Sequence, residues 1–369
     1  MSAGARITLL PGDGIGPEVT AAAQRALESL SRVSGLGLEL DVAEIGAAAL
    51  RSHGTALPPA TLAACESSDA IFLGAVGSPS APTATEGLTP EQALLTLRRH
   101  FELFANLRPV PRFEALTSLA PLKAERLDGV DLLFVRELNG GLYYGRRAEQ
   151  SADGDAFDTL SYSDREIHRI AKVAFELAGG RRQRVTSVDK ANVLASMRQW
   201  RRAVTAVGSA YPAVQLEHCY VDRLAMDLLH RPADLDVVLT GNLFGDILSD
   251  EAAAIAGSLG LLPSASLGAS TFGLYEPVHG SAPDIAGAGL ANPIGALLSV
   301  ALLARHSLGL EELAVRLESA VDEVLAEGLR TPDIAEEDSV ILSSTELAAE
   351  VTGRFEEAWW QSRVPLMVV

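Results

Sequence analysis

Short apolar runs alternate along this chain with longer stretches in which apolar and polar residues recur at helical spacing. Short, mostly apolar runs, such as AIFL (70–73) and VDLLFV (130–135), predict buried strands. Residues 17–32 and 164–178 predict helices, and further amphipathic helices are expected up to about residue 358. The last residues, 359–369, are unusually apolar, which predicts packing or a subunit contact.

Two aspartates follow an apolar strand predicted over residues 237–240. That strand ends at a glycine, and we predict a helix from about Phe244. Asp246 and Asp250 then lie four residues apart on one helical face, where two carboxylates repel each other. A divalent cation removes this cost, because Mg²⁺ and Mn²⁺ prefer carboxylate oxygens. Asp222 follows another strand-like run and offers a third carboxylate. The alternative is a solvated polar face on an ordinary helix.

A glycine-rich turn lies between the first predicted strand, residues 6–10, and the helix over 17–32. Its glycines, Gly12, Gly14 and Gly16, are spaced G-x-G-x-G. The dinucleotide-binding Rossmann fold requires G-x-G-x-x-G. This spacing is absent from the turn and from the rest of the chain. The sequence therefore argues against a Rossmann fold.

A further helix is predicted to open at Thr89-Pro90-Glu91. Threonine suits the N-cap, proline the first turn and glutamate the positive end of the helix. Arg98 in this helix and Arg108 beyond it each offer the planar fork of donors that a carboxylate prefers. Taken singly, each is better interpreted as a surface arginine.

Composition narrows the classes of partner. The 369 residues are enough for two domains or one large one, and 48% are hydrophobic while 21% are charged. The net charge of −18 argues against sequence-independent binding of nucleic acid, which needs a cationic surface. A multiply anionic substrate would therefore need its own local cluster of arginine, lysine and metal.

The remaining features predict a cytoplasmic location. Two cysteines make no disulfide framework, which fits a reducing cytosol. From the first residues, MSAGAR, we expect no signal peptide, and the longest uncharged helical stretch, residues 293–304, is too short to span a bilayer. We expect neither a membrane nor a nucleic-acid partner.

Several stretches together resemble one family. They are LPGDGIGPE (10–18), LRRHFELFANLRP (97–109), RELNGGLYYG (136–145), SVDKANV (187–193), GNLFGDILSDEAAAIAGSLGLLPSASLG (241–268) and EPVHGSAPDIAG (276–287). They resemble the β-decarboxylating dehydrogenases, the isocitrate and isopropylmalate dehydrogenase family, over about residues 7–344. Residues 77–82, GSPSAP, depart from the G-G-P-K-W-type segment that family members often carry on the nicotinamide side.

The resemblance implies an isocitrate/isopropylmalate dehydrogenase-like α/β fold of two domains with a mixed sheet, not a Rossmann fold. Residues 1–103 and 257–369 would form a discontinuous domain on the cofactor side. Residues 104–256 would form the domain for metal binding, substrate binding and dimerisation. An arm over about 146–159 would exchange between subunits, and the alternative is a plain surface loop.

The resemblance also implies residues for the reaction. Lys190 would take the C2 hydroxyl proton as hydride leaves for NAD, and Tyr143 would protonate the enol after CO₂ departs. Lys190 and Asp222 would cross into the partner's cleft, so that a homodimer shares its active sites. The arginines implied to clamp substrate carboxylates are Arg98, Arg108 and Arg136. The carboxylates implied to bind Mg²⁺ or Mn²⁺ are Asp222, Asp246 and Asp250, of which Asp222 also faces the substrate.

Substrate selectivity is expected on the helix that carries Arg98. In isocitrate-type relatives, small polar residues on this turn receive a third carboxylate, whereas this chain has Glu91, Leu94 and Leu95. An acidic and an aliphatic side chain would repel a carboxylate and accept a branched alkyl group, which favours 3-isopropylmalate as substrate. The alternative places Leu94 in the core and leaves Glu91 as a charge at the helix start.

The cofactor is expected to be NAD. A carboxylate at Asp284 can accept hydrogen bonds from both ribose hydroxyls and would repel a 2′-phosphate. The residues that the resemblance implies for cofactor binding are Ile15, Glu276, His279, Gly280, Ser281, Ala282, Pro283, Asp284, Ile285 and Asn292.

The expected reaction is oxidative decarboxylation of 3-isopropylmalate to 4-methyl-2-oxopentanoate and CO₂ with reduction of NAD, a step of leucine biosynthesis. A first alternative within the family is a tartrate or D-malate dehydrogenase, because the loop over 77–87 is unusual. A second alternative, from a different class, is an inactive paralogue that serves as a regulatory subunit. Every inferred catalytic position is filled, which argues against the second.

Overall fold

The computed structural model describes residues 4–78, 89–148 and 154–363. Most of the loop over 77–87, residues 149–153 of the expected arm and residues 364–369 of the apolar tail lie outside the described residues.

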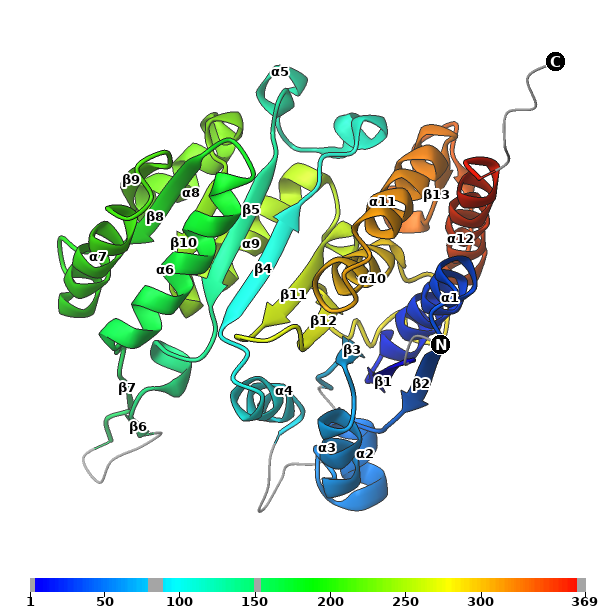
Figure 1. The fold of residues 1–369 in the computed structure, drawn as a ribbon, viewed down its shortest axis with the longest axis horizontal. Helices are drawn as coiled ribbons and strands as arrows, with labels where there is room; N and C mark the ends of the chain where they lie inside the picture. Colours follow the sequence, from blue (N-terminus) through cyan, green and yellow to red (C-terminus); the bar gives the residue numbers. More distant parts are fainter. Residues whose placement is uncertain (1–3, 79–88, 149–153, 364–369) are drawn as a thin grey trace.

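Within the described residues, ten strands form one sheet (Figure 1). Its central pairs β12–β11, β11–β4 and β4–β5 are antiparallel. The pairs on either side are parallel. The α/β fold with a mixed sheet is therefore confirmed. In sheet order the strands are β2 (Leu38–Val42), β1 (Ala5–Gly12), β3 (Ala70–Ala75), β12 (Gly273–Pro277), β11 (Pro263–Leu267), β4 (Ala105–Val110), β5 (Leu132–Glu137), β10 (Val237–Thr240), β8 (Arg184–Asp189) and β9 (Gln215–Tyr220).

The apolar runs of the sequence form the inner strands of this sheet. Every residue of β3, β5 and β10 is buried, because a strand covered on both faces needs apolar residues at successive positions. The edge strands β2 and β9 are mostly exposed or half-buried and carry charged side chains.

Helices cover the sheet and separate most of its strands along the chain. No helix in the described part of the chain is both long and apolar enough to cross a bilayer. The α-helices are α1 (Gly16–Ser34), α2 (Gly46–His53), α3 (Pro59–Glu66), α4 (Pro90–His100), α5 (Ala124–Leu127), α6 (Asp164–Gly179), α7 (Ala195–Gly208), α8 (Val221–His230), α9 (Asn242–Ala256), α10 (Ile294–His306), α11 (Glu311–Ala326) and α12 (Ser344–Gln361). The 3₁₀-helices are η1 (Glu114–Leu119), η2 (Leu142–Tyr144), η3 (Pro232–Asp234), η4 (Leu259–Leu261) and η5 (Pro332–Ile334), and the short strand pairs are β6 (Arg147–Ala148) with β7 (Phe157–Asp158) and β13 (Leu329–Arg330) with β14 (Val340–Ile341).

Each half of the sheet comes from one of the two sequence ranges that are predicted to form separate domains. Strands β2, β1, β3, β12 and β11 come from residues 1–103 and 257–369, and the other five come from residues 104–256. The two ranges therefore meet between β11 and β4. Figure 1 shows both ends of the described chain on the same side, with blue α1 beside red α12. The division into two domains stays a prediction.

Two helix starts bear on the site. The helix predicted from Thr89 is α4, and Thr89 and Gln92 cap its N-terminus by exchanging hydrogen bonds with each other's backbone. The helix predicted from about Phe244 begins earlier, at Asn242. Gly241 there is still extended, with φ −70° and ψ 172°, so the turn from β10 into α9 takes a single residue.

Candidate active site

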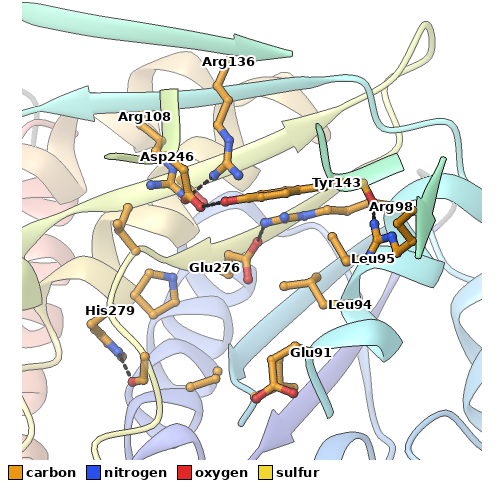
Figure 2. Close-up of a pocket in the computed structure, with 18 residues that line it drawn as sticks. Glu91, Leu94, Leu95, Arg98, Arg108, Arg136, Tyr143, Asp246, Glu276 and His279 are labelled. Atoms are coloured by element: carbon orange, nitrogen blue, oxygen red, sulfur yellow. Dashed lines mark hydrogen bonds and ion pairs between the residues drawn. The ribbon is translucent and has the colours of Figure 1, made fainter. Parts of the chain in front are cut away.

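A cavity of about 530 Å³ opens where β11 and β4 meet, between α4 and α9 (Figure 2). Its walls come from β3, α4, β4, β5, η2, β6, α9, β11, β12 and the segment that follows β12. The residues predicted from sequence that line it are Glu91, Leu94, Arg98, Arg108, Arg136, Tyr143, Asp246, Glu276, His279 and Gly280.

Strand register brings two of the predicted arginines to one face of the sheet. Arg136 of β5 lies opposite Asn106 of β4, and Arg108 is two residues further along β4, so all three project from the same face. Arg136 Nη1 donates to Asp246 Oδ1 at 2.6 Å. Arg108 Nη1 donates to Asp250 Oδ1 at 3.0 Å, and Arg108 Nη2 lies 3.5 Å from Asp246.

Burial sets the electrostatics of these arginines. Burial, followed by the nearby charge of Arg108, lowers the pKa of Arg136 to about 9, although the charge of Asp246 opposes the change. Burial also lowers the pKa of Arg108, against the pull of Asp246 and Asp250. Removing a cation from water costs free energy unless anions replace the lost hydration. The pair is therefore suited to an anionic ligand.

The third predicted arginine has a different partner. Arg98 Nη2 of α4 donates to Glu276 Oε1 of β12 at 2.7 Å, and both side chains are almost fully buried. A residue predicted to bind substrate thus contacts one predicted to bind the cofactor. Arg98 Nε is buried without a hydrogen-bond partner.

Tyr143 lines the cavity, and Figure 2 shows its hydroxyl end pointing toward Asp246. Its hydroxyl donates to Asp246 Oδ2 at 2.8 Å, and the Arg136 guanidinium carbon lies 6.0 Å from the centre of its ring. Burial, followed by the hydrogen bond to Asp246, raises the pKa of Tyr143 to about 12. The hydroxyl therefore keeps its proton at neutral pH, as a proton donor must.

Asp246 and Asp250 are one helical turn apart on α9, beside these arginines. Burial raises the pKa of Asp250. At Asp246 the same effect of burial is outweighed by the charges of Arg136 and Arg108 and by the Tyr143 hydrogen bond, so the pKa is lowered. Among the described residues, no group of three acidic, histidine or cysteine side chains is placed to hold a metal. The two carboxylates fit a divalent cation as a partial donor set.

Lys190 and Asp222 do not line this cavity. Lys190, which follows β8, donates through Nζ to Asp222 Oδ1 at the start of α8. Asp222 is largely solvent-exposed, and Lys190 is partly so. A single chain therefore brings Asp246 close to Tyr143 and the arginines but leaves this lysine–aspartate pair elsewhere.

The predicted cofactor loop packs on the glycine-rich turn. Ile15 N donates to the Ser281 carbonyl at 2.8 Å. A Cβ on Gly14, whose φ is +59°, would lie 1.9 Å from that same oxygen, so only glycine permits this approach. Ser281 is buried, whereas Pro283 and Asp284 are exposed. The remaining predicted loop residues, Ala282 and Ile285, are half-buried.

His279 and Asn292, which are also predicted to bind the cofactor, differ in how many of their side-chain polar atoms are hydrogen-bonded. His279 Nδ1 contacts the Gly280 carbonyl at 2.9 Å, while its Nε2 is buried without a partner and burial lowers the pKa of the ring. The Asn292 side-chain oxygen accepts from Ile294 N at 3.0 Å at the start of α10, and its Nδ2 donates to Asp333 at 3.1 Å. At most one side-chain N–H of Asn292 is left for the cofactor.

The site also contains residues that the sequence analysis missed. Asn106 and Asn242 contact the arginines from behind, and Ser249 Oγ accepts from Arg108 Nη1 at 2.7 Å. The signal for Asn106 was present, because residues two apart on a strand share a face and Asn106 precedes Arg108 by two. Asn242 comes just after the strand predicted over 237–240, and no local spacing marks it as a partner of Arg136.

Comparison with known proteins agrees with this geometry. The family model described as Isocitrate/isopropylmalate dehydrogenase matches residues 6–351. The chain is 52% identical over 353 residues to 3-isopropylmalate dehydrogenase of Anaeromyxobacter dehalogenans, covering 95% of this chain and 99% of that protein. It is 50% identical over 349 residues to 3-isopropylmalate dehydrogenase of Bacillus subtilis, covering 94% and 95%.

Solved structures show the same fold. Isocitrate dehydrogenase from Methylococcus capsulatus superposes with a TM-score of 0.85 at 34% identity, over 95% of this chain and 99% of that one. A β-decarboxylating dehydrogenase from Thermococcus kodakarensis in its apo form superposes with a TM-score of 0.80 at 34% identity, covering 98% of each chain.

The fold and site together define an α/β dehydrogenase with a mixed sheet. More specifically, the chain belongs to the isocitrate/isopropylmalate dehydrogenase family, as the sequence motifs predicted. Membership implies a nicotinamide cofactor and a divalent metal in general terms.

Proposed function

We propose that the chain oxidises and decarboxylates 3-isopropylmalate to 4-methyl-2-oxopentanoate and CO₂ with reduction of NAD, in leucine biosynthesis. The observation that carries this proposal is an apolar patch beside the arginines. Leu94 and Leu95 of α4 line the same cavity as Arg98, Arg108 and Arg136. Figure 2 shows Leu94 and Leu95 between the arginine cluster and Glu91. The curated relatives named for this reaction support the same substrate.

In the proposed mechanism the arginines bind the two carboxylates of the substrate. The leucines of α4 contact its isopropyl group, and Glu91 disfavours a ligand with a third carboxylate. This arrangement holds C2 and C3 beside the Tyr143 hydroxyl, so the reacting atoms are oriented before reaction.

Asp246 and Asp250, with Asp222 of a second copy, would hold Mg²⁺ or Mn²⁺. When bound, the cation would polarise the C2 oxygen and stabilise negative charge during decarboxylation, while NAD would accept the C2 hydride. Lys190 of a second copy takes the C2 hydroxyl proton as the ketone forms. The C3–C4 bond then breaks to release CO₂, and Tyr143 supplies the proton that C3 gains.

We infer that the active form is a homodimer with shared sites. Lys190 and Asp222 lie away from the cavity of their own chain, which supports their action in another. Exposed apolar side chains on the adjacent helices α8 and α9 support an interface there: Met226 and Ile247 are each 60% exposed and Leu229 is 40% exposed. Covering such side chains with a second copy lowers the free energy of the assembly, because apolar surface is removed from water.

We infer NAD rather than NADP because the exposed Asp284 carboxylate can accept from both ribose hydroxyls. Asp284→Lys should raise the KM for NAD by about tenfold or more, the cost of losing charged hydrogen bonds, and should improve use of NADP. Initial rates with each cofactor measure this. An unchanged KM for NAD would contradict the assignment.

The assay that tests the proposed function follows NADH absorbance with 3-isopropylmalate and Mg²⁺ or Mn²⁺, beside D-malate, isocitrate and NADP. A strong preference for 3-isopropylmalate with NAD is expected. Equal or faster turnover of D-malate would overturn the substrate while keeping the mechanism, and no turnover of any of these acids would support the inactive paralogue. The two free, buried cysteines, Cys65 and Cys219, fit the cytoplasmic location that we infer.

A further inference from the structure

Two buried asparagines lie behind two of the cavity's arginines. Asn106 Oδ1 accepts from Arg108 Nε at 2.8 Å. Asn242 Oδ1 accepts from Arg136 Nε at 3.2 Å and from Arg136 Nη2 at 2.8 Å. Asn106 is 0% exposed and Asn242 is 1% exposed, and neither lines the cavity. Each asparagine thus holds the rear edge of an arginine without reaching the substrate space.

The other end of each carboxamide is anchored to the backbone. Asn106 Nδ2 donates to the Ala265 carbonyl at 3.4 Å and to Ser266 Oγ at 3.2 Å, both on β11. Because this NH₂ group already has acceptors, a rotated amide would lose them and would turn a donor toward the arginine. The oxygen of Asn106 therefore faces Arg108.

Asn242 is anchored in the same way, and to the segment that leads to Tyr143. Its Nδ2 donates to the Leu138 carbonyl at 2.9 Å and to the Gly140 carbonyl at 3.2 Å. Its backbone N–H donates to the Tyr162 hydroxyl at 2.7 Å. One side chain therefore connects Arg136 with the loop between β5 and η2.

The hydrogen bond to Nε also fixes the direction in which the Nη groups of each guanidinium point. With Nε engaged, Arg108 Nη1 reaches Ser249 and Asp250, and Arg136 Nη1 reaches Asp246. A guanidinium has five N–H donors in a rigid fork, so hydrogens on Nη remain for a substrate carboxylate.

The chemical identity of the rear partner matters as much as its position. An amide oxygen orients an arginine without cancelling its charge, whereas a carboxylate there would do both. Arg98 shows the contrast, because its partner is the Glu276 carboxylate at 2.7 Å. In the part of the chain that the structure describes, the carboxylates that contact Arg108 and Arg136 are Asp246 and Asp250, where the metal is proposed to bind.

We propose that Asn106 and Asn242 are positioning residues that aim Arg108 and Arg136 and leave the charge of both arginines available to the substrate's carboxylates. This inference rests on the proposed function of the cavity.

The test replaces each amide by the nearly isosteric acid. Asn106→Asp and Asn242→Asp each add one negative charge against an arginine and remove the donors of the amide. Each should raise the KM for 3-isopropylmalate about tenfold or more, the scale of a charged hydrogen bond. The KM for NAD should stay within about twofold of wild type, a split that a general loss of structure would not produce.

A matched control makes the same change at Asn139, whose side chain hydrogen-bonds to none of the three arginines and whose Oδ1 has no partner. Asn139→Asp should leave the KM for 3-isopropylmalate within about twofold. If an aspartate variant does not fold, Asn106→Ser and Asn242→Ser replace it, with the same split of KM values expected at smaller size.

Folded aspartate variants with an unchanged KM for 3-isopropylmalate would overturn the inference, as would equal increases in both KM values. Failure of the wild-type protein to turn over 3-isopropylmalate would instead overturn the proposed function. The two failures are therefore separable.

Discussion

At the scale of single residues, the cavity is organised around Asp246. This carboxylate accepts from Tyr143 and Arg136 and lies 3.5 Å from Arg108. One side chain thus connects the proposed proton donor with two arginines proposed to bind substrate. The roles themselves stay predictions, and two of them can be separated by kinetics.

Tyr143→Phe should retain hydride transfer but slow the protonation of C3. Its hydroxyl is the proposed donor, and phenylalanine keeps the ring while losing the proton and the bond to Asp246. General acid catalysis commonly contributes about 100-fold or more, so 4-methyl-2-oxopentanoate should form at least that much more slowly. Lys190→Ala, in contrast, should abolish NADH formation. Measuring both products in single turnovers distinguishes the steps, and full turnover by either variant would remove that residue's role.

Buried Glu137 should make stability depend on pH. Its side chain is 0% exposed and accepts from Asn139 N, Gly140 N and Arg169. Burial nevertheless raises the pKa of Glu137 from 4.5 to about 7. The folded state then binds this proton more tightly than the unfolded state, so stability falls as pH rises from about 4.5 to about 7, by roughly 3 kcal/mol.

Glu137→Gln should flatten this part of the stability curve, as measured by urea unfolding at several pH values. The exposed Glu28→Gln is the control and should leave the slope unchanged. A Glu137→Gln variant with the wild-type slope would show that Glu137 does not titrate in this range.

At the scale of elements, α4 carries both halves of the proposed specificity. Its first turns present Glu91, Leu94 and Leu95, and its last turn presents Arg98. The Thr89 side chain accepts from the Gln92 backbone N–H, and the Gln92 side chain accepts from the Thr89 backbone N–H. These bonds satisfy N–H groups that have no partner within the first turn of a helix, and so they fix where α4 begins. The cap therefore helps to place the residues of α4 that are proposed to contact the substrate.

Thr89→Ala should cost about 1 kcal/mol of stability, the usual value of an N-cap. It should also raise the KM for 3-isopropylmalate, because the first turns of α4 become less ordered. Thermal unfolding and initial rates measure the two effects. Thr96→Ala in the same helix is the control, since Thr96 bonds only to the helix's own Gln92 carbonyl. Equal behaviour of the two variants would contradict a role for the cap.

At the scale of the whole molecule, the described chain contains an incomplete version of the proposed site. The cavity has arginines, the tyrosine and two aspartates, whereas Lys190 and Asp222 pair with each other elsewhere. A second copy is the simplest source of the missing groups, and the exposed apolar face of α8 and α9 is where we expect it to bind.

Met226→Asp should therefore convert the dimer to monomers and abolish turnover, since each buried methionine contributes about 1.5–3 kcal/mol. Light scattering measures the mass, and Val315→Asp, an exposed apolar position on α11, is the control. Mixing Lys190→Ala with Tyr143→Phe subunits should restore some activity, because one of the two shared sites then has both native residues. A dimeric, active Met226→Asp protein would exclude this interface.

The local features of the fold and the site could be predicted from the order of the amino acids. Apolar runs marked the buried strands, the Thr89 cap marked α4, and helical spacing placed Asp246 and Asp250 one turn apart. The absence of G-x-G-x-x-G spacing excluded a Rossmann fold, and the family motifs marked residues that line the cavity. These features depend on neighbours within about one helical turn or two strand positions, which periodicity and capping reveal directly.

The contacts between residues distant in the chain could not be predicted in this way, because they depend on how the strands and helices pack. Strands β12 and β11 insert between β3 and β4, which brings Glu276 to Arg98, 178 residues away. The same sheet brings Asn242 behind Arg136, 106 residues away, and leaves Lys190 and Asp222 outside the cavity. Strand order and packing fix such contacts, and no local spacing encodes them, because segments remote in the chain become neighbours only when the apolar faces of the sheet and helices are buried together.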